Sequence, residues 1–238
     1  MITPDKDPMG AAIADFHQHH KASKLRVFSP DFDEDEIPVA LLFRSANEMP
    51  KLEQKSLQMA SGRILDVGAG AGCHALALQE LGKEVVAIDI SPRSVETMVQ
   101  RGVRDAREED FWTVHERYDT VLMLMNGIGI VGKVSELPRF FRHLDTILAP
   151  GGQVLLDSSD LCYLFETEED IIEIPDTGSY YGELEYTMKY KNVKGDAFPW
   201  LYVDFDLLAS IGNANGYNVE LVDEGEHYDY LARITKQQ

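Results

Sequence analysis

One stretch, from Arg63 to Ile90, constrains the fold of this chain more than any other. It reads as an apolar strand, a loop with three glycines at alternate positions, a helix to about Leu81 and a second apolar strand that ends at Asp89. Glycine lacks a Cβ, so such a loop can turn sharply and let a ligand approach the backbone. The helix presents free N–H groups to that ligand, and an acid about 20 residues further on can accept hydrogen bonds from a ribose. The stretch predicts a β-α-β unit that binds a nucleoside-containing cofactor.

The glycine spacing narrows the choice of cofactor. A dinucleotide fingerprint that starts at Gly68 needs a glycine at position 73, where the chain has Cys73. A register from Gly70 to Ala75 fits the permissive form, but it begins two residues late after the strand. Residues 66–72 instead read D-V-G-A-G-A-G, which resembles the first motif of the class I S-adenosylmethionine-dependent methyltransferases. An NAD(P)-dependent oxidoreductase that uses the later register stays open as an alternative.

The resemblance implies S-adenosylmethionine as the cofactor and gives several residues a role. Gly68, Gly70 and Gly72 would admit its methionine part, Asp66 would meet its amino group or an ordering water, and Asp89 would hold the ribose. The complete set of expected cofactor-binding residues is Arg44, Asp66, Gly68, Ala69, Gly70, Gly72, His74, Asp89, Ile90, Asp110, Phe111, Met125 and Asn126. No metal site is expected.

Two of these roles carry alternatives. In the resembling family an acid after the third strand accepts a hydrogen bond from the adenine amino group, which fits Asp110, with Phe111 against the ring. One of the two preceding glutamates would serve if the loop differs by one residue, and a solvated turn is the other interpretation. Arg44 is expected to clamp the cofactor carboxylate through two hydrogen bonds. An ion pair with Glu48 or another nearby acid is its alternative.

The run from Tyr118 to Met125 is continuously apolar, as expected for a buried central parallel strand, and Asn126 follows it. Ligands of open α/β sheets lie outside the carboxyl ends of the strands, so this turn is expected to line the transfer site. Members of the resembling family that methylate nucleic-acid bases commonly carry a [D/N/S]-P-P-[Y/F] motif here. This chain has no proline at positions 127 or 128, which favours a small-molecule or other non-base acceptor. Asn126 is expected to contact cofactor or substrate, or to cap the turn.

The remaining elements extend the same pattern. Ser135–Leu148 carries an apolar stripe at helical spacing, and the Pro-Gly-Gly that follows, before a strand at Val154–Asp157, is a second marker of the resembling family. The other expected elements are helices at Asp7–Ala22, Lys51–Ser61, Ser91–Arg101, Leu161–Asp170 and Asp204–Ala214, a strand at Val103–Ala106, an exposed strand or hairpin at Tyr180–Lys191, a turn at Phe198–Trp200, and strands at Asn218–Asp223 and Tyr228–Thr235.

These elements predict an α/β fold: a Rossmann-like methyltransferase sandwich with a seven-stranded, mostly parallel sheet and a C-terminal antiparallel hairpin. The chain is expected to be a single domain over residues 1–238. Residues 1–61 would form an N-terminal helical cap, 62–158 the cofactor-binding core, and 159–238 the C-terminal strands and elements on the substrate side. Tyr180, Tyr181 and Trp200 would either line an acceptor pocket or pack between elements.

Charge and cysteine content limit the partners. Asp and Glu outnumber Lys and Arg by 41 to 22, a formal net charge of −19. Such a negative field repels phosphate backbones, so a nucleic-acid substrate is disfavoured. Solubility, or attraction of a cationic ligand, would each explain the excess of acidic residues. No run approaches the ~18 apolar residues of a membrane span. Cys73 and Cys162 form neither a disulfide framework nor a metal-ligand spacing, which suits the cytoplasm.

The expected activity is methyl transfer to an unidentified acceptor. The transfer would be an in-line displacement at the sulfonium methyl, so that positioning the acceptor and excluding water supply most of the catalysis. No residue identifies itself as a general base, and the sequence names no catalytic residue. A protein that binds the cofactor without transferring its methyl group is a further alternative.

Overall fold

The fold is built on a seven-stranded sheet with the strand order β11-β12-β7-β6-β3-β4-β5. The computed structural model describes residues 2–166, 172–174 and 178–237. The strands of this main sheet are β3 (Arg63–Val67), β4 (Glu84–Asp89), β5 (Ala106–Glu108), β6 (Tyr118–Met123), β7 (Leu148–Ser159), β11 (Tyr217–Glu224) and β12 (Asp229–Lys236). In the sheet, β7, β6, β3, β4 and β5 lie side by side in this order and pair in parallel. By contrast, β12 pairs antiparallel with both β7 and β11. The expected sheet with its C-terminal antiparallel hairpin is confirmed.

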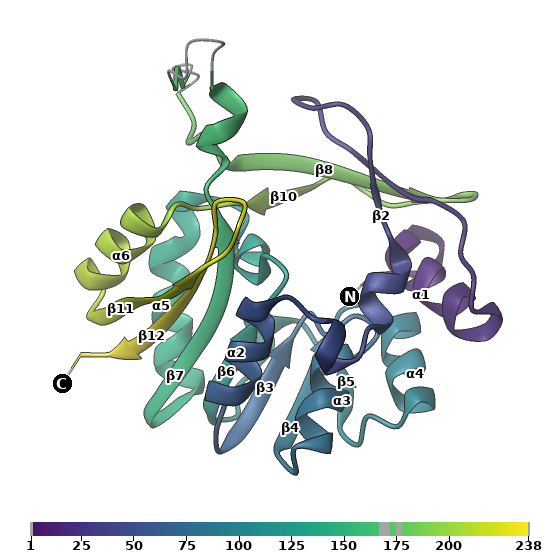
Figure 1. The fold of residues 1–238 in the computed structure, drawn as a ribbon, viewed down its shortest axis with the longest axis horizontal. Coiled ribbons are helices and arrows are strands. Elements are labelled where there is room, and N and C mark those ends of the chain that lie inside the picture. The colour runs from purple at the N-terminus through teal and green to yellow at the C-terminus, as the bar shows by residue number, and fades with distance from the viewer. Residues whose placement is uncertain (1, 167–171, 175–177, 238) are drawn as a thin grey trace.

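Helices cover both faces of the main sheet (Figure 1). One face packs against α2 (Lys51–Met59), α3 (Cys73–Glu80) and α4 (Pro92–Arg101), and the other against α5 (Leu137–Ile147) and α6 (Phe205–Ala214). Central strands such as β6 are therefore buried on both sides, as their continuous apolar runs predicted. The apolar stripe of α5 is buried along its whole length. Within the described part of the chain, the helices are all too short or too polar to cross a membrane.

A second sheet, which the sequence did not predict, lies across the carboxyl ends of the parallel strands (Figure 1). Its order is β10-β8-β1-β2, with β9 paired to β8. Its strands are β1 (Leu25–Phe28), β2 (Asp35–Ile37), β8 (Glu183–Tyr190), β9 (Val193–Lys194) and β10 (Phe198–Leu201). Helix α1 (Pro8–His19) packs against β8 and against α4. The N-terminal segment, expected to be a helical cap, thus supplies strands as well as helices.

Short 3-10 helices occupy several connections near the carboxyl edge of the main sheet. They are η1 (Pro4–Lys6), η2 (Val39–Phe43), η3 (Ala46–Glu48), η4 (Phe111–Thr113), η5 (Gly127–Val131), η6 (Val134–Glu136) and η7 (Leu161–Phe165). The helix expected at Leu161–Asp170 is only this 3-10 turn as far as Phe165, and residues 167–170 lie outside the described residues.

Two further local predictions were wrong. The third strand begins at Ala106 instead of Val103, because Gly102 ends α4 in a left-handed conformation and the N–H of Val103 still donates to a helix carbonyl. Phe198–Trp200 is a strand and not a turn. Pro199 is tolerated there because β10 is an edge strand, where one side needs no ladder hydrogen bonds.

Candidate functional site

The glycine loop between β3 and α3 is held in a backbone conformation that suits glycine. Gly68, Gly70 and Gly72 have φ angles of 67°, 57° and 81°. At Gly72 a Cβ would lie 2.9 Å from side-chain carbons of Met98 and Val103, so the loop packs tightly against α4 there. At Gly68 and Gly70, by contrast, a Cβ would meet only one isoleucine methyl each, at 3.6 and 3.9 Å. The start of the loop therefore leaves its backbone open to a ligand.

Asp89 ties the end of β4 to this loop. Its Oδ2 accepts a hydrogen bond from the Gly70 N–H at 2.8 Å, and its Oδ1 accepts one from the Ser91 N–H at 2.8 Å. Burial raises the pKa of Asp89 to about 6, although both of these hydrogen bonds act to lower it. Each carboxylate oxygen keeps a further acceptor position, and two adjacent ribose hydroxyls could donate to them. Ile90, 46% exposed, stands beside it.

A buried ion network lies beside the loop. His74 Nε2 is 2.7 Å from Glu53 Oε2, and the other oxygen of this carboxylate accepts a hydrogen bond from the guanidinium of Arg44. All three side chains are less than a tenth exposed. Burial alone would raise the pKa of Glu53 and lower that of His74. Their mutual hydrogen bond and charges outweigh burial, so the pKa of Glu53 is lowered and that of His74 is raised.

Glu53 was missed in the sequence. The signal for it was an acid on the buried side of a helix, since Leu52, Ser56 and Leu57 around it are also buried. An acid at such a position is costly unless it has a partner. The alternative partner of Arg44, Glu48, is instead engaged in the capping box of η3 with Ser45.

Two polar atoms in this region lack a partner. Asp66 Oδ2 and Arg44 Nε are buried and have no hydrogen-bond partner among the residues that the structure describes. Burial raises the pKa of Asp66 to about 6, against the charge of His74. Cys73 is the first residue of α3. Burial, together with the charges of Asp66 and Glu53, raises the pKa of its thiol to about 12.

The unsatisfied pair fits one kind of ligand. A buried polar atom without a partner costs about 1–3 kcal/mol, so natural proteins rarely keep one without a reason. A carboxylate would satisfy the guanidinium N–H of Arg44, and an ammonium would satisfy the oxygen of Asp66. The amino-acid end of S-adenosylmethionine carries both groups. The residues present therefore fit the cofactor that the glycine loop predicts.

The segment after β5 contains the residues expected to meet adenine. Asp110 caps η4, and its Oδ1 accepts a hydrogen bond from the Trp112 N–H at 2.9 Å. The ring of Phe111 is buried, with its centroid 5.9 Å from that of Phe140 and 4.8 Å from that of His143. Phe111 thus belongs to the core beneath α5, and its contact with an adenine ring stays a prediction.

The turn after β6 is held by an acid at the end of β7. Met125 and Asn126 both have left-handed backbones, and their N–H groups donate to Asp157 at 3.0 and 2.7 Å. The side chain of Asn126 is also engaged, because it donates to the Leu201 carbonyl and accepts from the Ser158 hydroxyl. Burial raises the pKa of Asp157 to about 6. The sequence predicted Asp157 only as the last residue of a strand, and its role at the site was missed. Its position directly after an apolar run was the signal that could have identified it.

The three aromatic residues whose role was left open divide into two groups. The Tyr180 hydroxyl donates to Asp204 and the Tyr181 hydroxyl to Asp160, each at 2.6 Å, so both phenols are fixed by acids of neighbouring segments. The indole of Trp200 rests on Gly129, where a Cβ would lie 2.1 Å from an indole carbon. Trp200 therefore stands over the turn that follows Asn126.

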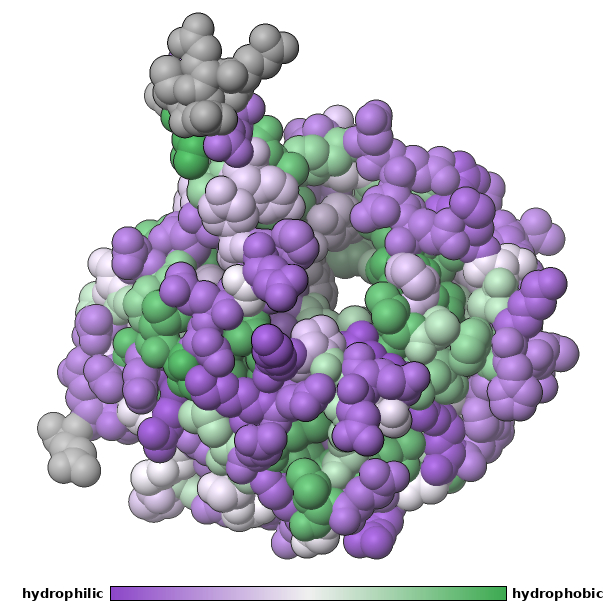
Figure 2. All heavy atoms as spheres, in the orientation of Figure 1, coloured by the Kyte–Doolittle hydropathy of each residue, from purple (hydrophilic) through white to green (hydrophobic). Residues whose placement is uncertain are grey.

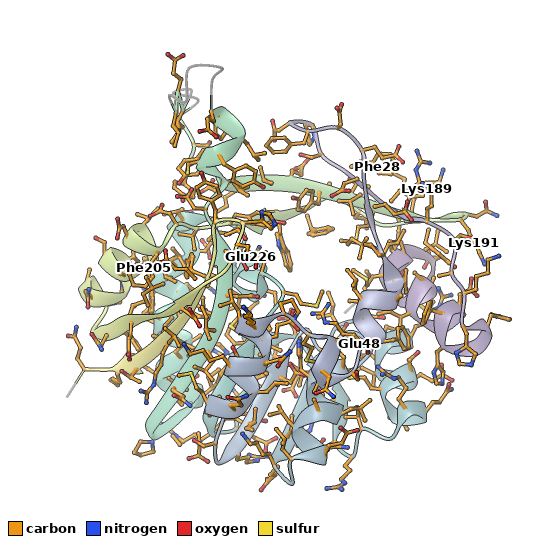
Figure 3. The ribbon with its side chains drawn as sticks, in the orientation of Figure 1. Phe28, Glu48, Lys189, Lys191, Phe205 and Glu226 are labelled. Atoms are coloured by element: carbon orange, nitrogen blue, oxygen red, sulfur yellow. The ribbon has the colours of Figure 1, made fainter. Side chains whose placement is uncertain are left out.

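The second sheet and the main sheet enclose an opening. Figure 2 shows this opening in the space-filling view, with hydrophobic surface on part of its rim and hydrophilic surface on the rest. In the same orientation Figure 3 locates Phe28 and Lys189 on the second sheet and Glu48 on the opposite side of the opening. In Figure 1 the connections that follow β3 and β6, which hold the glycine loop and the turn at Asn126, lie at the edge of the main sheet that faces the second sheet.

Comparisons with known proteins agree on one family. A family profile described as a methyltransferase domain matches residues 34–222. A crystal structure of an S-adenosylmethionine-dependent methyltransferase from Bacteroides fragilis, in complex with S-adenosyl-L-homocysteine, is 55% identical with a TM-score of 0.94. That match covers 100% of this chain and 98% of the other.

Curated relatives match less than half of the chain. The cypemycin N-terminal methyltransferase of a Streptomyces species is 34% identical over 102 residues, which are 41% of this chain and 42% of that protein. A ubiquinone biosynthesis O-methyltransferase of Xanthomonas euvesicatoria is 30% identical over 111 residues, 43% of this chain and 45% of that protein. The matches thus span less than half of the length of these relatives.

Proposed function

Because this chain belongs to the class I S-adenosylmethionine-dependent methyltransferases, we propose that it transfers a methyl group from S-adenosylmethionine to a small-molecule acceptor. The single observation that carries the proposal is the pair of unsatisfied buried atoms, Arg44 Nε and Asp66 Oδ2, beside an open glycine loop. The matches with known proteins give no support to the oxidoreductase alternative.

The proposed cofactor site runs along the carboxyl ends of β3 and β4. Arg44 holds the carboxylate and Asp66 the ammonium of the methionine part, while His74 and Glu53 keep the guanidinium of Arg44 in place. Asp89 holds the ribose. The backbone of the glycine loop supports the cofactor at Gly68, Ala69, Gly70 and Gly72. The remaining contacts come from Ile90, Asp110, Phe111, Met125 and Asn126.

When bound, the cofactor supplies an electrophilic methyl group on a sulfonium. The residues of the chain bind it, orient it and exclude water. Asn126 and Met125 are fixed by Asp157 through two backbone hydrogen bonds, so this turn can present a rigid wall to an incoming acceptor. Trp200, packed on Gly129, covers the same turn from the second sheet and keeps solvent from it.

A small acceptor is supported by the surroundings of the site. The turn after β6 lacks the proline pair of base-methylating enzymes, and the net charge of −19 opposes a phosphate backbone. The second sheet narrows access to the carboxyl edge (Figure 2). Cys73 and Cys162 are free thiols, which supports a reducing compartment such as the cytoplasm. The division into an N-terminal cap, a cofactor core and a C-terminal part stays a proposal of the same kind.

Calorimetry with S-adenosyl-L-homocysteine and with NAD tests the cofactor. We expect binding of S-adenosyl-L-homocysteine in the micromolar range or tighter and none of NAD. Arg44→Lys, which keeps the charge but loses the Nε donor, should weaken binding, whereas Lys55→Arg, in an exposed ion pair with Asp223, serves as control. Tight NAD binding without binding of S-adenosyl-L-homocysteine would refute the proposal. If the cofactor binds but no acceptor of a broad panel is methylated, the alternative holds that this protein binds the cofactor without transferring its methyl group.

A further inference from the structure

The second sheet has an inner face that is defined by its strand pairing. Leu25 pairs with Tyr190 and Val27 with Met188. Leu25, Tyr190 and Met188 pack in one cluster with residues of α1, and Val27 is buried, so this face points into the molecule. Side chains alternate along a strand, so Tyr186 and Leu184 lie on the same face of β8. Their partners in β10, Phe198 and Trp200, continue this face: Phe198 pairs with Tyr186 and Trp200 with Leu184.

The inner face is aromatic over the opening. The ring centroids of Tyr186 and Phe198 are 6.3 Å apart, and those of Phe198 and Trp200 are 6.0 Å apart. The Tyr186 hydroxyl also lies 3.4 Å from the Tyr202 hydroxyl, at the limit of a hydrogen bond. These rings run from the middle of β8 to the turn at Gly129, over which Trp200 stands. They form a continuous wall above the carboxyl edge of the main sheet.

One acid lies on the same face of the second sheet as this wall. Among the consecutive acids at β2, Glu34 binds Arg26 and Glu36 binds Lys24. Asp35 between them pairs opposite Val27, on the inner face, and takes part in no ion pair among the described residues. Among the residues that the structure describes, the Asp35 side chain accepts one hydrogen bond, from the N–H of Glu36. Asp35 is therefore on the inner face by its register, is exposed to solvent there, and has no cationic partner among the described residues.

The electrostatics link this acid to the wall and to the site. Burial raises the pKa of both Tyr186 and Tyr202, and the charge of Asp35 raises each further. The charge of Asp157, at the end of β7, also acts on Tyr202. Tyr202 is thus influenced by one carboxylate on the second sheet and by another at the end of β7. The inner-face positions from Val27 to Trp200 named above carry no Lys or Arg that would neutralise them.

From this arrangement we propose that the acceptor is an organic amine that binds as its ammonium ion, and that Asp35 is the residue that selects it. An ammonium has no lone pair, so the nitrogen gives up one proton to solvent before transfer. The free amine then forms the bond to the methyl carbon while the bond from that carbon to sulfur breaks, and S-adenosylhomocysteine leaves. The inference rests on the proposed methyl transfer and names its substrate class. An ammonium is attracted to the faces of Tyr and Trp rings and to a carboxylate at the same time. A neutral acceptor of the same size gains neither interaction, and an anionic one is repelled by Asp35 and Asp157. The acidity of the chain as a whole adds long-range attraction for the same ligand.

Three probes with one skeleton test the charge preference: phenethylamine, 2-phenylethanol and phenylacetate. Binding to the full chain, with and without S-adenosyl-L-homocysteine, is followed by tryptophan fluorescence in the Trp112→Phe variant, where Trp200 is the remaining tryptophan. We expect phenethylamine to bind in the millimolar range and the other two probes at least about fivefold more weakly.

Asp35→Asn should weaken phenethylamine binding about three- to tenfold and leave 2-phenylethanol unchanged. Glu36→Gln, which removes a neighbouring acid from the outer face, is the matched control and should alter neither. Circular dichroism and thermal unfolding verify that both variants fold. Equal binding of the three probes, no binding of phenethylamine, or an unaltered affinity in Asp35→Asn would each overturn the inference. If S-adenosyl-L-homocysteine binds but the charge preference is absent, this inference fails and the proposed function stands; without cofactor binding, the proposed function itself fails.

Discussion

His74 Nε2 lies 2.7 Å from Glu53 Oε2, a contact that joins the start of α3 to α2 inside the protein. The same carboxylate also accepts from Arg44, so one buried acid binds a guanidinium and an imidazole that come from different segments. Since Arg44 is expected to bind the cofactor carboxylate, Glu53 fixes the position of a binding group without touching the cofactor. The segment before α2 is thereby connected to the glycine loop.

Glu53→Gln should lower both stability and cofactor affinity. Loss of the buried charge leaves the Arg44 guanidinium without its counter-ion and the His74 ring without its acidic partner, and breaking a buried ion pair typically costs about 3–5 kcal/mol. We expect a lower free energy of unfolding in urea and a weaker affinity for S-adenosyl-L-homocysteine by calorimetry. Glu48→Gln, at an exposed capping position, is the control and should change either quantity much less. Full cofactor affinity in a folded Glu53→Gln protein would show that Arg44 does not depend on this acid.

Asp66 should make stability depend on pH. Burial raises its pKa from 3.8 to about 6 in the folded protein. Between these two pH values the folded state keeps a proton on Asp66 that the unfolded state has lost. The stabilisation that results is therefore complete below pH 4 and is lost as the pH rises through 6. The shift of about 2 units corresponds to about 3 kcal/mol. The free energy of unfolding of Asp66→Asn, relative to the wild type, should therefore increase by about that amount from pH 4 to pH 8.

The same titration should respond to the cofactor. An ammonium beside Asp66 favours its ionised form, so saturating S-adenosyl-L-homocysteine should reduce the loss of stability between pH 4 and pH 6. Affinity for S-adenosyl-L-homocysteine should also rise over this range in the wild type and stay flatter in Asp66→Asn. Parallel affinity profiles for the two proteins would contradict a contact between Asp66 and the amino group.

Asp89→Ala should weaken cofactor binding by about 2 kcal/mol, the value of charge-assisted hydrogen bonds to a ribose. The substitution also frees the Gly70 N–H, so the loop should become less rigid. Calorimetry with S-adenosyl-L-homocysteine measures the effect, and Glu96→Ala, an exposed acid on α4, is the control. An unchanged affinity in Asp89→Ala would show that Asp89 does not bind the ribose.

Gly129→Ala should displace Trp200 from the turn after β6. A Cβ at this position would lie 2.1 Å from an indole carbon, a distance that the ring can escape only by moving. We expect a shift in the emission of Trp200, measured in a Trp112→Phe background, and lower turnover with nearly unchanged cofactor affinity. Gly195→Ala, where the nearest contact would be 3.4 Å, is the control. An unaltered emission spectrum would mean that the indole does not rest on Gly129 in solution.

The parts of the fold that were predicted are those encoded locally. Ser91 caps α4 and Gly102 ends it as expected, and the glycine loop meets Asp89 through Gly70. The second sheet was not predicted, because its pairing joins residues from opposite ends of the chain, as in Leu25 with Tyr190. No local pattern encodes such a partner.

The site shows the same division. The loop and the acid at the end of β4 could be found from spacing alone, whereas the partner of Arg44 could not. Glu48 was nearest in sequence, but it satisfies the N–H of Ser45 in a capping box, and Glu53 binds the arginine instead. Choosing between the two acids requires knowing which one faces the interior, and α2 acquires a buried side only by packing on the sheet.

The position of β12 has a consequence for synthesis of the protein. This strand, Asp229–Lys236, follows all the other described strands in sequence but lies inside the main sheet, between β7 and β11. Until it has left the ribosome, the edge of β7 stays open to pairing with other chains. Nascent chains that pause before residue 229 should therefore depend on chaperones, and a deletion of the last ten residues should yield aggregates instead of a smaller folded enzyme.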